Sequence, residues 1–383
     1  MKNYKDLTDG ELFELKRKCE LDISKYHNFQ LVRKIQLNSA YGAIGNQYFR
    51  YYSTELAEAI TLSGQLSIQW IGQELNKYLN KIVGTTDIDY VIASDTDSVY
   101  LCLDSLVEKI YPAVSIFDGE TKVTKPKTNV IVDFLDKSAE ELILPFIDKK
   151  FKNLAEIMNA YENKMQMGRE VIADKGIWTA KKRYMLNVWD SEGVRYNEPK
   201  LKIMGIETTR SSTPEFVRKH LKTAITITMS GTENDMINFV EQCRNEFYAL
   251  PPEEIAFPRS VNGMEKYSDR ATIYRKSTPI AVKGALIYNH YIDLFKLNKK
   301  YKKIIEGDKI KFLMLKKPNP LGGMSGEDQV VSFVNVLPKE FNLESYIDYK
   351  TQFEKSFIDP LTTILDTIGW SAERKCTLEN LFG

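Results

Sequence analysis

The chain has 383 residues, of which 43% are hydrophobic and 27% are charged, a composition typical of folded proteins with more than one domain and not of disordered chains. The first ten residues are mostly polar and no run of about 18 apolar residues occurs, so we expect neither a signal peptide nor a membrane span and predict a cytoplasmic protein. The formal net charge is only +1, which excludes nucleic-acid binding through an overall excess of positive charge.

Two helices are predicted at the N-terminus. Thr8 and Glu11 form the signature of a capping box, in which each side chain satisfies a backbone N–H at the start of a helix. Apolar residues then recur at helical spacing, so we expect one helix from about residue 9 and a second over residues 30–41. The two should pair as a helical hairpin.

A long helix and a β-hairpin should follow. The helix is predicted to start with a cap at Ser53 or Thr54 and to end at Gly84. Two strand-like runs within residues 90–103 are joined by a short polar segment, which indicates a hairpin on which the helix lies. The side of the helix expected to be buried carries Leu56, Ile60, Ser63, Trp70, Ile71, Leu75 and Ile82.

The rest of the chain indicates an α+β fold. A helical stretch is expected around residues 131–160, and the pattern becomes mostly helical again from residue 213. Between them lie strand signals that glycines and turn residues separate. The predicted strands lie near 167–173, 177–189 and 194–204, with breaks at Gly176 and at 191–193, and a strand-like insertion is expected near 280–315.

Positive charge is concentrated in two segments. Residues 175–210 carry eight Lys or Arg against four acids, and residues 296–317 carry nine Lys against two acids. Such stretches can contact phosphates, although a solvated surface is the commoner reason for a run of like charges.

The strongest chemical signal is the predicted hairpin turn that bears Asp95 and Asp97. Two carboxylates so close together can hold a hard divalent cation such as Mg²⁺, which accepts oxygen ligands and leaves room for substrate phosphates. A solvated acidic turn is the alternative, because Asp is common in turns. An EF-hand does not fit, since the loop lacks the central Gly and the terminal Glu.

A stripe on the predicted second helix complements this turn. Lys34, Asn38 and Tyr41 stand at positions i, i+4 and i+7, so a cation, an amide and an aromatic ring line one face over roughly 10 Å. This arrangement can bind a triphosphate at one end and stack on a base pair at the other. Each residue alone would suit an ordinary amphipathic helix.

Together these residues resemble the family B DNA polymerases. Residues 34–42 (KIQLNSAYG) are similar to the K-x-x-x-N-S-x-Y-G fingers motif, and residues 94–98 (SDTDS) to the D-T-D-S palm motif, in the family's order. Residues 178–184 (WTAKKRY) resemble its K-K-R-Y element. The likeness is greatest to the replicative polymerases of T-even-like bacteriophages, through residues 202–207 and 283–289 and a C-terminal peptide, 377–383, like their clamp-binding tail.

The resemblance implies a partial right-hand polymerase fold and its activity. Residues 1–45 would be the C-terminal part of the fingers, 46–205 the C-terminal part of a mixed palm with an antiparallel sheet, and 206–383 a mostly helical thumb that ends in the tail 377–383. The activity would be nucleotidyl transfer from a dNTP to a primer 3′-hydroxyl during phage DNA replication, with release of pyrophosphate and with two Mg²⁺ ions.

The resemblance also assigns a role to individual residues. Asp97 would bind the catalytic metals directly and Asp95 would tune their coordination, while Lys34, Asn38 and Tyr41 would contact the incoming nucleotide and the nascent base pair. Glu170 and Asp190 match auxiliary acids of the palm, with a strand-edge charge and a surface turn as their structural alternatives. The predicted primer-template DNA contacts are Lys181, Lys182, Arg183, Tyr184 and Arg210, and the predicted sliding-clamp contacts are Leu378, Leu381 and Phe382.

Two departures from the family pattern lead to a hypothesis about partners. Gly168 stands where the phage enzymes carry another acid, and no D-x-x-S-L-Y-P-like segment, which supplies the family's other metal-binding Asp, occurs in the sequence. We therefore expect a split polymerase, in which an N-terminal chain supplies that motif, the exonuclease and the first fingers helix. A truncated form of a complete polymerase and a non-catalytic protein that binds DNA and tethers the clamp are the alternatives.

Overall fold

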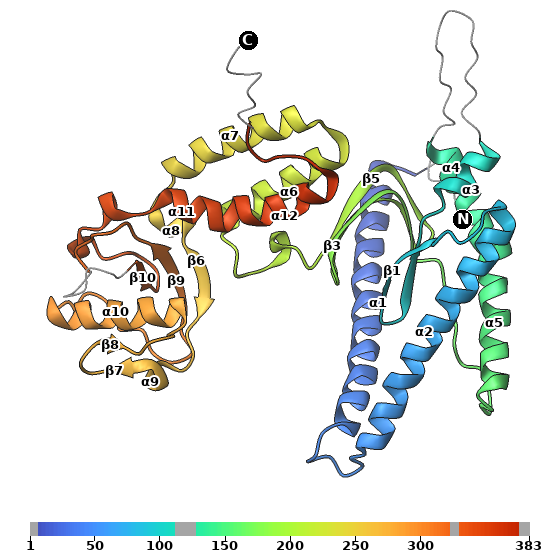
Figure 1. The fold of residues 1–383 in the computed structure, drawn as a ribbon, viewed down its shortest axis with the longest axis horizontal. Helices are drawn as coiled ribbons and strands as arrows, with labels where there is room; N and C mark the ends of the chain where they lie inside the picture. The colour runs from blue at the N-terminus through green and yellow to red at the C-terminus, as the bar shows by residue number, and fades with distance from the viewer. Residues whose placement is uncertain (1–6, 112–127, 322–328, 375–383) are drawn as a thin grey trace, which may run out of the picture. The chain divides into compact units, whose positions relative to one another are not determined.

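The computed structural model describes residues 7–111, 128–321 and 329–374. The chain divides into two compact units, residues 1–168 and residues 169–383, which we call the N-terminal and C-terminal units (Figure 1). The predicted palm, 46–205, spans parts of both units, and the predicted subdomain limits stay predictions. Within the described residues, no helix is long and apolar enough to cross a membrane.

The N-terminal unit begins with one continuous helix of 36 residues, α1 (Asp9–Ile44). The predicted capping box is confirmed, because Thr8 and Glu11 each bond to the other's backbone N–H. The predicted helical hairpin is wrong. Residues 27–29 contain neither Gly nor Pro, so nothing in the backbone stops the helix where a turn was expected.

The second helix, α2 (Thr54–Val83), begins and ends where the sequence predicts. The Ser53 hydroxyl accepts from the Leu56 N–H at 3.1 Å, and Gly84 closes the helix with a left-handed φ of 81°. The middle of α2 packs against the hairpin of β1 and β2 and against α5, with Ile71 and Leu75 fully buried. Its first turns were also predicted to be buried, but Leu56 and Ile60 are each about half exposed. No described element covers these two side chains.

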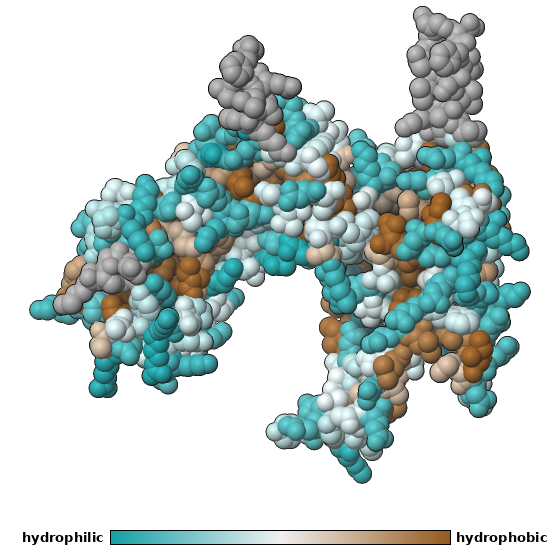
Figure 2. Space-filling view, in the orientation of Figure 1, coloured by the Kyte–Doolittle hydropathy of each residue, from teal (hydrophilic) through white to brown (hydrophobic). Residues whose placement is uncertain are grey.

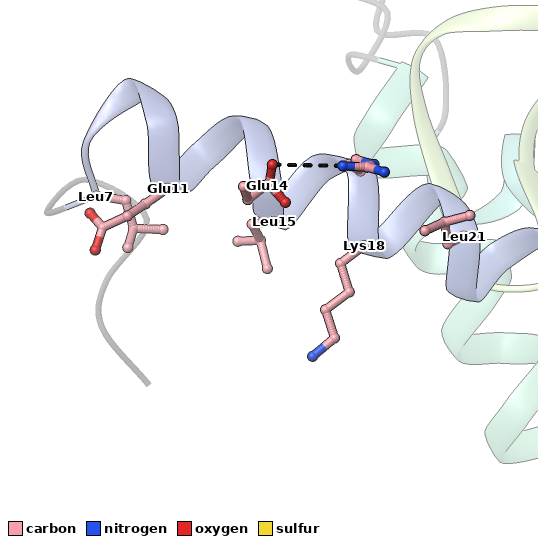
Figure 3. Close-up of a pocket in the computed structure, with 7 residues that line it drawn as sticks. Leu7, Glu11, Glu14, Leu15, Lys18 and Leu21 are labelled. Atoms are coloured by element: carbon pink, nitrogen blue, oxygen red, sulfur yellow. Dashed lines mark ion pairs between the residues drawn. The ribbon is translucent and has the colours of Figure 1, made fainter.

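None of the residues of α1 is buried, and only Leu15, Asp22, Ala43 and Ile44 are partly covered. Figure 2 shows hydrophobic residues open at the surface of this unit. A shallow groove on α1, near Leu15 and Lys18, is lined by successive turns of the same helix and by Leu7 (Figure 3). The exposed apolar residues, here called the α1 apolar surface, are Leu12, Phe13, Leu21, Ile23, Tyr26, Phe29, Leu31, Val32, Ile35, Leu37 and Tyr41.

The remaining elements of the N-terminal unit form a small antiparallel hairpin and a helical layer. Its predicted helix over 131–160 is confirmed as α4, a π-helical turn and α5. The bounds are β1 (Val91–Asp95), β2 (Ser98–Leu101), α3 (Asp104–Ile110), α4 (Thr128–Ser138), η2 (Ala139–Ile143) and α5 (Leu144–Ile157).

The C-terminal unit opens with a three-stranded antiparallel sheet in the order β3-β4-β5. The strands are β3 (Val171–Ala180), β4 (Arg183–Ser191) and β5 (Val194–Met204). The predicted break at Gly176 is wrong, because β3 runs through it and turns at residues 181–182. Glycine is needed there for space, since a Cβ would lie 2.6 Å from the Trp178 ring. The predicted turn before β5 is confirmed, with Glu192 and Gly193 at φ 52° and 84°, as a tight hairpin requires.

Helices and a second antiparallel sheet, β10-β9-β6, build the rest of this unit. Of the strand-like insertion predicted near 280–315, only β9 (Lys309–Met314) is a strand. Ile280–Leu294 instead forms the helix α10, with Ala281, Ala285 and Ile292 buried on one side. Helical spacing outweighs strand propensity there. Gly284 lets α10 approach β10, since a Cβ would lie 2.5 Å from the Ser332 hydroxyl.

The hydrophobic core of the C-terminal unit is continuous through its helices and the second sheet, and a smaller cluster joins α6 and α12 to the first sheet. The mixed architecture with small antiparallel sheets is confirmed. The bounds are η3 (Glu207–Thr209), α6 (Glu215–Ser230), α7 (Glu233–Ala249), α8 (Pro252–Ile255), β6 (Phe257–Ser260), α9 (Met264–Tyr267), β7 (Ser268–Asp269), β8 (Ile273–Tyr274), α10 (Ile280–Leu294), β9 (Lys309–Met314), β10 (Val330–Phe333), η4 (Lys339–Phe341), η5 (Glu344–Tyr346), α11 (Tyr349–Phe353), η6 (Glu354–Ile358), α12 (Asp359–Leu365) and η7 (Asp366–Ile368).

Candidate functional site

The acidic hairpin turn forms as predicted. Asp95 ends β1 and pairs with Ser98 across the hairpin, while Thr96 takes a positive φ of 56°. The Asp97 N–H donates to the Asp95 carbonyl at 2.7 Å, and the Thr96 hydroxyl donates to the Asp95 carboxylate at 3.0 Å. Asp97 is exposed and Asp95 is half-buried. One tight turn thus presents both carboxylates at the end of the hairpin.

The donor set of this turn suits a hard divalent cation but is incomplete for two. Within residues 7–111, 128–321 and 329–374, no group of three or more His, Cys, Asp or Glu side chains could hold a metal ion. Carboxylate oxygens are the ligands that Mg²⁺ accepts, and Asp95 and Asp97 provide them. A pair of ions a few ångströms apart needs further acids from another segment.

The predicted stripe of Lys34, Asn38 and Tyr41 lies on the C-terminal half of α1. All three side chains are exposed, Tyr41 by 41%. Their spacing on a regular helix confirms that they share one face. The stripe belongs to the same long helix as the α1 apolar surface, so polar and apolar groups are displayed together.

The basic residues Lys181 and Lys182 form the two-residue turn between β3 and β4. Both side chains are exposed, and Lys182 has a φ of 63°, which is uncommon outside glycine. Tyr184 is buried and its ring stacks on Trp178 at 6.1 Å between centroids. The two lysines therefore project from a hairpin tip, whereas Tyr184, which was predicted to contact DNA with them, has a buried side chain.

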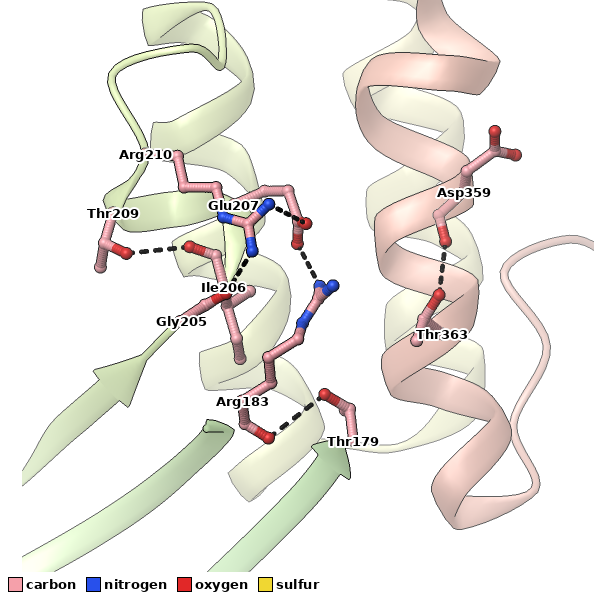
Figure 4. Close-up of polar contacts among 9 residues, drawn as sticks. All are labelled: Thr179, Arg183, Gly205, Ile206, Glu207, Thr209, Arg210, Asp359 and Thr363. Carbon is pink, nitrogen blue, oxygen red and sulfur yellow. Dashed lines mark hydrogen bonds and ion pairs between the residues drawn. The ribbon is translucent and has the colours of Figure 1, made fainter. Parts of the chain in front are cut away.

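The two predicted DNA-contacting arginines share one acid. Arg183 Nη2 donates to Glu207 Oε2 at 2.6 Å, and Arg210 Nη1 lies 3.5 Å from Glu207 Oε1. Arg210 Nη2 also donates to the Gly205 carbonyl at 3.0 Å. Figure 4 shows Glu207 between the two guanidinium groups. The Arg183 side chain is 27% exposed and the Arg210 side chain 49%, so Arg210 keeps more surface open to a ligand.

The two predicted auxiliary acids lie in different environments. Glu170 is exposed and pairs with Lys202 at 3.2 Å. Asp190 is 1% exposed, so its alternative as a surface turn is wrong; it binds Arg169 and accepts from Arg195 Nε at 3.0 Å. Burial alone would raise the pKa of Asp190, but the hydrogen bonds from Arg195 and Arg169 outweigh it and lower the pKa.

The lysine-rich segment 296–317 is partly neutralised within its own unit. Lys300 bonds to Glu340 at 2.5 Å, and Lys303 bonds to Asp293 at 2.7 Å. These ion pairs agree with the alternative given above, in which the run of lysines belongs to a solvated protein surface and does not bind a ligand.

The predicted clamp-binding residues Leu378, Leu381 and Phe382 lie outside the described residues.

The sequence did not predict the residues that form ion pairs with the candidate site residues Asp190 and Arg183. Arg169, Arg195 and Glu207 stand 21, 5 and 24 residues from the groups they bind, and no motif connects them.

The chain is similar in sequence to a known protein family and to two curated proteins. The family model described as DNA polymerase family B matches residues 14–134. The chain is 36% identical to the DNA-directed DNA polymerase of Enterobacteria phage T4 over all of its own length and 41% of that protein. It is 39% identical to the DNA-directed DNA polymerase of Escherichia phage RB69 over 92% of its own length and 38% of that protein. The chain thus spans about two fifths of the length of these curated relatives.

Proposed function

Since this chain belongs to DNA polymerase family B, we propose that it is the C-terminal catalytic portion of a template-directed DNA polymerase of bacteriophage replication. It would take part in nucleotidyl transfer from a dNTP to a primer 3′-hydroxyl, with release of pyrophosphate. The observation that carries the proposal is the turn that places Asp95 and Asp97 together at the tip of one hairpin. Two-metal phosphoryl transfer needs such fixed carboxylates.

The two carboxylates would hold Mg²⁺ together with acids from outside this sequence. The bound ions would supply activation of the 3′-hydroxyl and stabilisation of charge on the phosphate oxygens. The Asp97 N–H to Asp95 carbonyl bond of 2.7 Å holds the backbone of the turn, which keeps the two carboxylates on one short segment.

Side chains on two other elements would bind the substrates. Lys34 would attract the triphosphate of the dNTP, and Asn38 and Tyr41, one and two turns further along α1, would face the nascent base pair. Lys181 and Lys182 would contact the primer-template DNA from the tip of the β3–β4 hairpin. Contacts of lysines to phosphate and sugar are tolerant of base sequence, which suits a polymerase that copies any template.

The proposal includes an N-terminal polymerase chain that carries the exonuclease and the first palm carboxylate motif. The α1 apolar surface supports this partner, because large exposed apolar patches commonly mark protein–protein interaction sites. Phe13, Ile23 and Leu37 are each more than 60% exposed on α1.

A sliding clamp is proposed as a second partner, bound through Leu378, Leu381 and Phe382. Deletion of residues 377–383 should leave distributive primer extension intact and remove the processivity that a clamp confers. Processive synthesis by the shortened chain would contradict the assignment of this tail.

Primer extension by the chain mixed with an N-terminal polymerase portion tests the main proposal. We expect extension by the mixture, none by either part alone, and none after Asp97→Ala. Asp148→Ala is the matched control, because Asp148 is an exposed carboxylate of the same unit, on α5. DNA binding with no extension in any mixture would instead favour a non-catalytic DNA-binding and clamp-tethering protein. Full extension by this chain alone would contradict the need for a partner.

A further inference from the structure

The tip of the β3–β4 hairpin is supported from behind by the end of β5. Gly205 directly follows β5 and has a φ of 69°. A Cβ at this position would lie 2.1 Å from the Lys182 carbonyl oxygen and 3.1 Å from the Lys182 carbonyl carbon. No side chain fits there, so the backbone of Gly205 touches the backbone of the lysine turn directly.

Glu207 fastens the same place through charge. It lies two residues after Gly205 and binds Arg183, the residue that follows the lysine turn, at 2.6 Å. It also pairs with Arg210, which in turn donates to the Gly205 carbonyl at 3.0 Å. Its side chain is 17% exposed, so these charge-assisted hydrogen bonds are shielded from water more than a surface pair would be.

The surroundings of Glu207 are otherwise positive. Besides Arg183, Arg210 and the lysine turn, they include Arg259; burial lowers its pKa most, and it lies close enough to Arg210 for the charge of Arg210 to lower that pKa further. One carboxylate among so many cations has two possible effects on an anionic ligand. It weakens the attraction by its charge, or it strengthens binding by holding the cations in place.

We propose that Glu207 and Gly205 are positioning residues, which hold the Lys181–Lys182 turn in the conformation that contacts the sugar–phosphate backbone of DNA. Glu207 draws Arg183 back against the end of β5, and Gly205 allows the close backbone approach that keeps Lys182 at its positive φ of 63°. This inference rests on the proposed function for the DNA contact, and on the geometry of the hairpin for the positioning.

The two effects of Glu207 predict opposite outcomes for Glu207→Gln. If charge alone matters, removal of a negative group beside the cations tightens DNA binding. If Glu207 positions the turn, binding becomes about five- to tenfold weaker, the equivalent of losing about one ordinary hydrogen bond. Glu198→Gln is the matched control, because Glu198 is an exposed acid on the adjoining strand β5. This control should leave affinity unchanged or raise it slightly.

The experiment measures two quantities on the 383-residue chain and its variants. Affinity for a primer-template duplex is measured by fluorescence anisotropy at fixed salt, and amide hydrogen exchange is measured over residues 179–185 without DNA. Glu207→Gln and Gly205→Ala should both weaken binding and speed exchange at the turn, while the exchange of α10 stays unchanged and shows that the fold is intact.

The outcomes separate this inference from the proposed function. If the wild-type chain does not bind the duplex, the proposed DNA contact fails, while faster exchange at the turn in Glu207→Gln still supports the positioning. Tighter DNA binding by Glu207→Gln, or exchange at the turn equal to wild type, overturns the positioning role.

Discussion

Replacement of Asp190 with Asn removes the negative charge that two arginines of the C-terminal unit share. Asp190 is 1% exposed, and the side chains of Arg169 and Arg195 are 11% and 30% exposed. The carboxylate also accepts from the Gly193 N–H at 3.0 Å, so it joins the start of β3 to the turn before β5. An amide of the same shape keeps one acceptor and places an N–H group against guanidinium donors.

The expected loss follows from the burial of these charges. Breaking a buried ion pair by removal of one partner costs about 3–5 kcal/mol. Water can reach Arg195, so we expect the lower end, about 3 kcal/mol, for Asp190→Asn. Asp174→Asn is the matched control on β3. Asp174 is exposed, and its carboxylate accepts a hydrogen bond from the neutral Asn187 amide at 2.7 Å. Its cost should stay below about 0.5 kcal/mol.

Tryptophan fluorescence during urea unfolding measures the free energy of unfolding of the C-terminal unit, to which Asp190 belongs. Three of the four tryptophans, Trp178, Trp189 and Trp370, belong to the C-terminal unit. The folded-state pKa of Asp190 is lowered from its ordinary 3.8, so its contribution to stability is fully present above that value. It should diminish as the pH falls further below about 4. A cost equal to that of Asp174→Asn, or one that grows towards acid pH, would show that the ion pairs of the Asp190 carboxylate do not stabilise this unit.

Two further predictions concern other contacts of the C-terminal unit. Gly284→Ala should destabilise this unit by about 1–3 kcal/mol in the same urea assay, because a Cβ would lie 2.5 Å from the Ser332 hydroxyl and 2.9 Å from the Ser332 backbone nitrogen. Stability equal to that of the wild type would show that α10 can shift freely. Lys300→Met should raise the pKa of Glu340, held at about 2 chiefly by the Lys300 hydrogen bond, towards 4.5. An NMR titration in which it remains near 2 would contradict that cause.

Local sequence patterns predicted the elements whose signals lie within a few residues. The capping box at Thr8, the stop at Gly84 and the Glu192–Gly193 turn all depend on the conformation of neighbouring backbone. The candidate site was predictable for the same reason, because the acidic turn and the Lys34 stripe each occupy one short segment. The relative positions of these residues depend on the local backbone conformation and not on how the rest of the chain folds.

Patterns that tertiary packing can override misled the prediction. Gly176 indicated a strand break, yet it serves the close approach of the Trp178 ring. The apolar run at 280–294 indicated a strand, yet its residues recur at helical spacing and pack as α10 against β10.

Caps, turns and contiguous motifs could be located from the amino-acid pattern, because they depend only on neighbours along the chain. Which charged side chains pair depends on the three-dimensional packing. Arg169 reaches Asp190 across 21 residues and Arg183 reaches Glu207 across 24, through the pairing of strands β3, β4 and β5. A one-residue change in strand register would send those side chains to the opposite face, so no local pattern could have predicted the pairs.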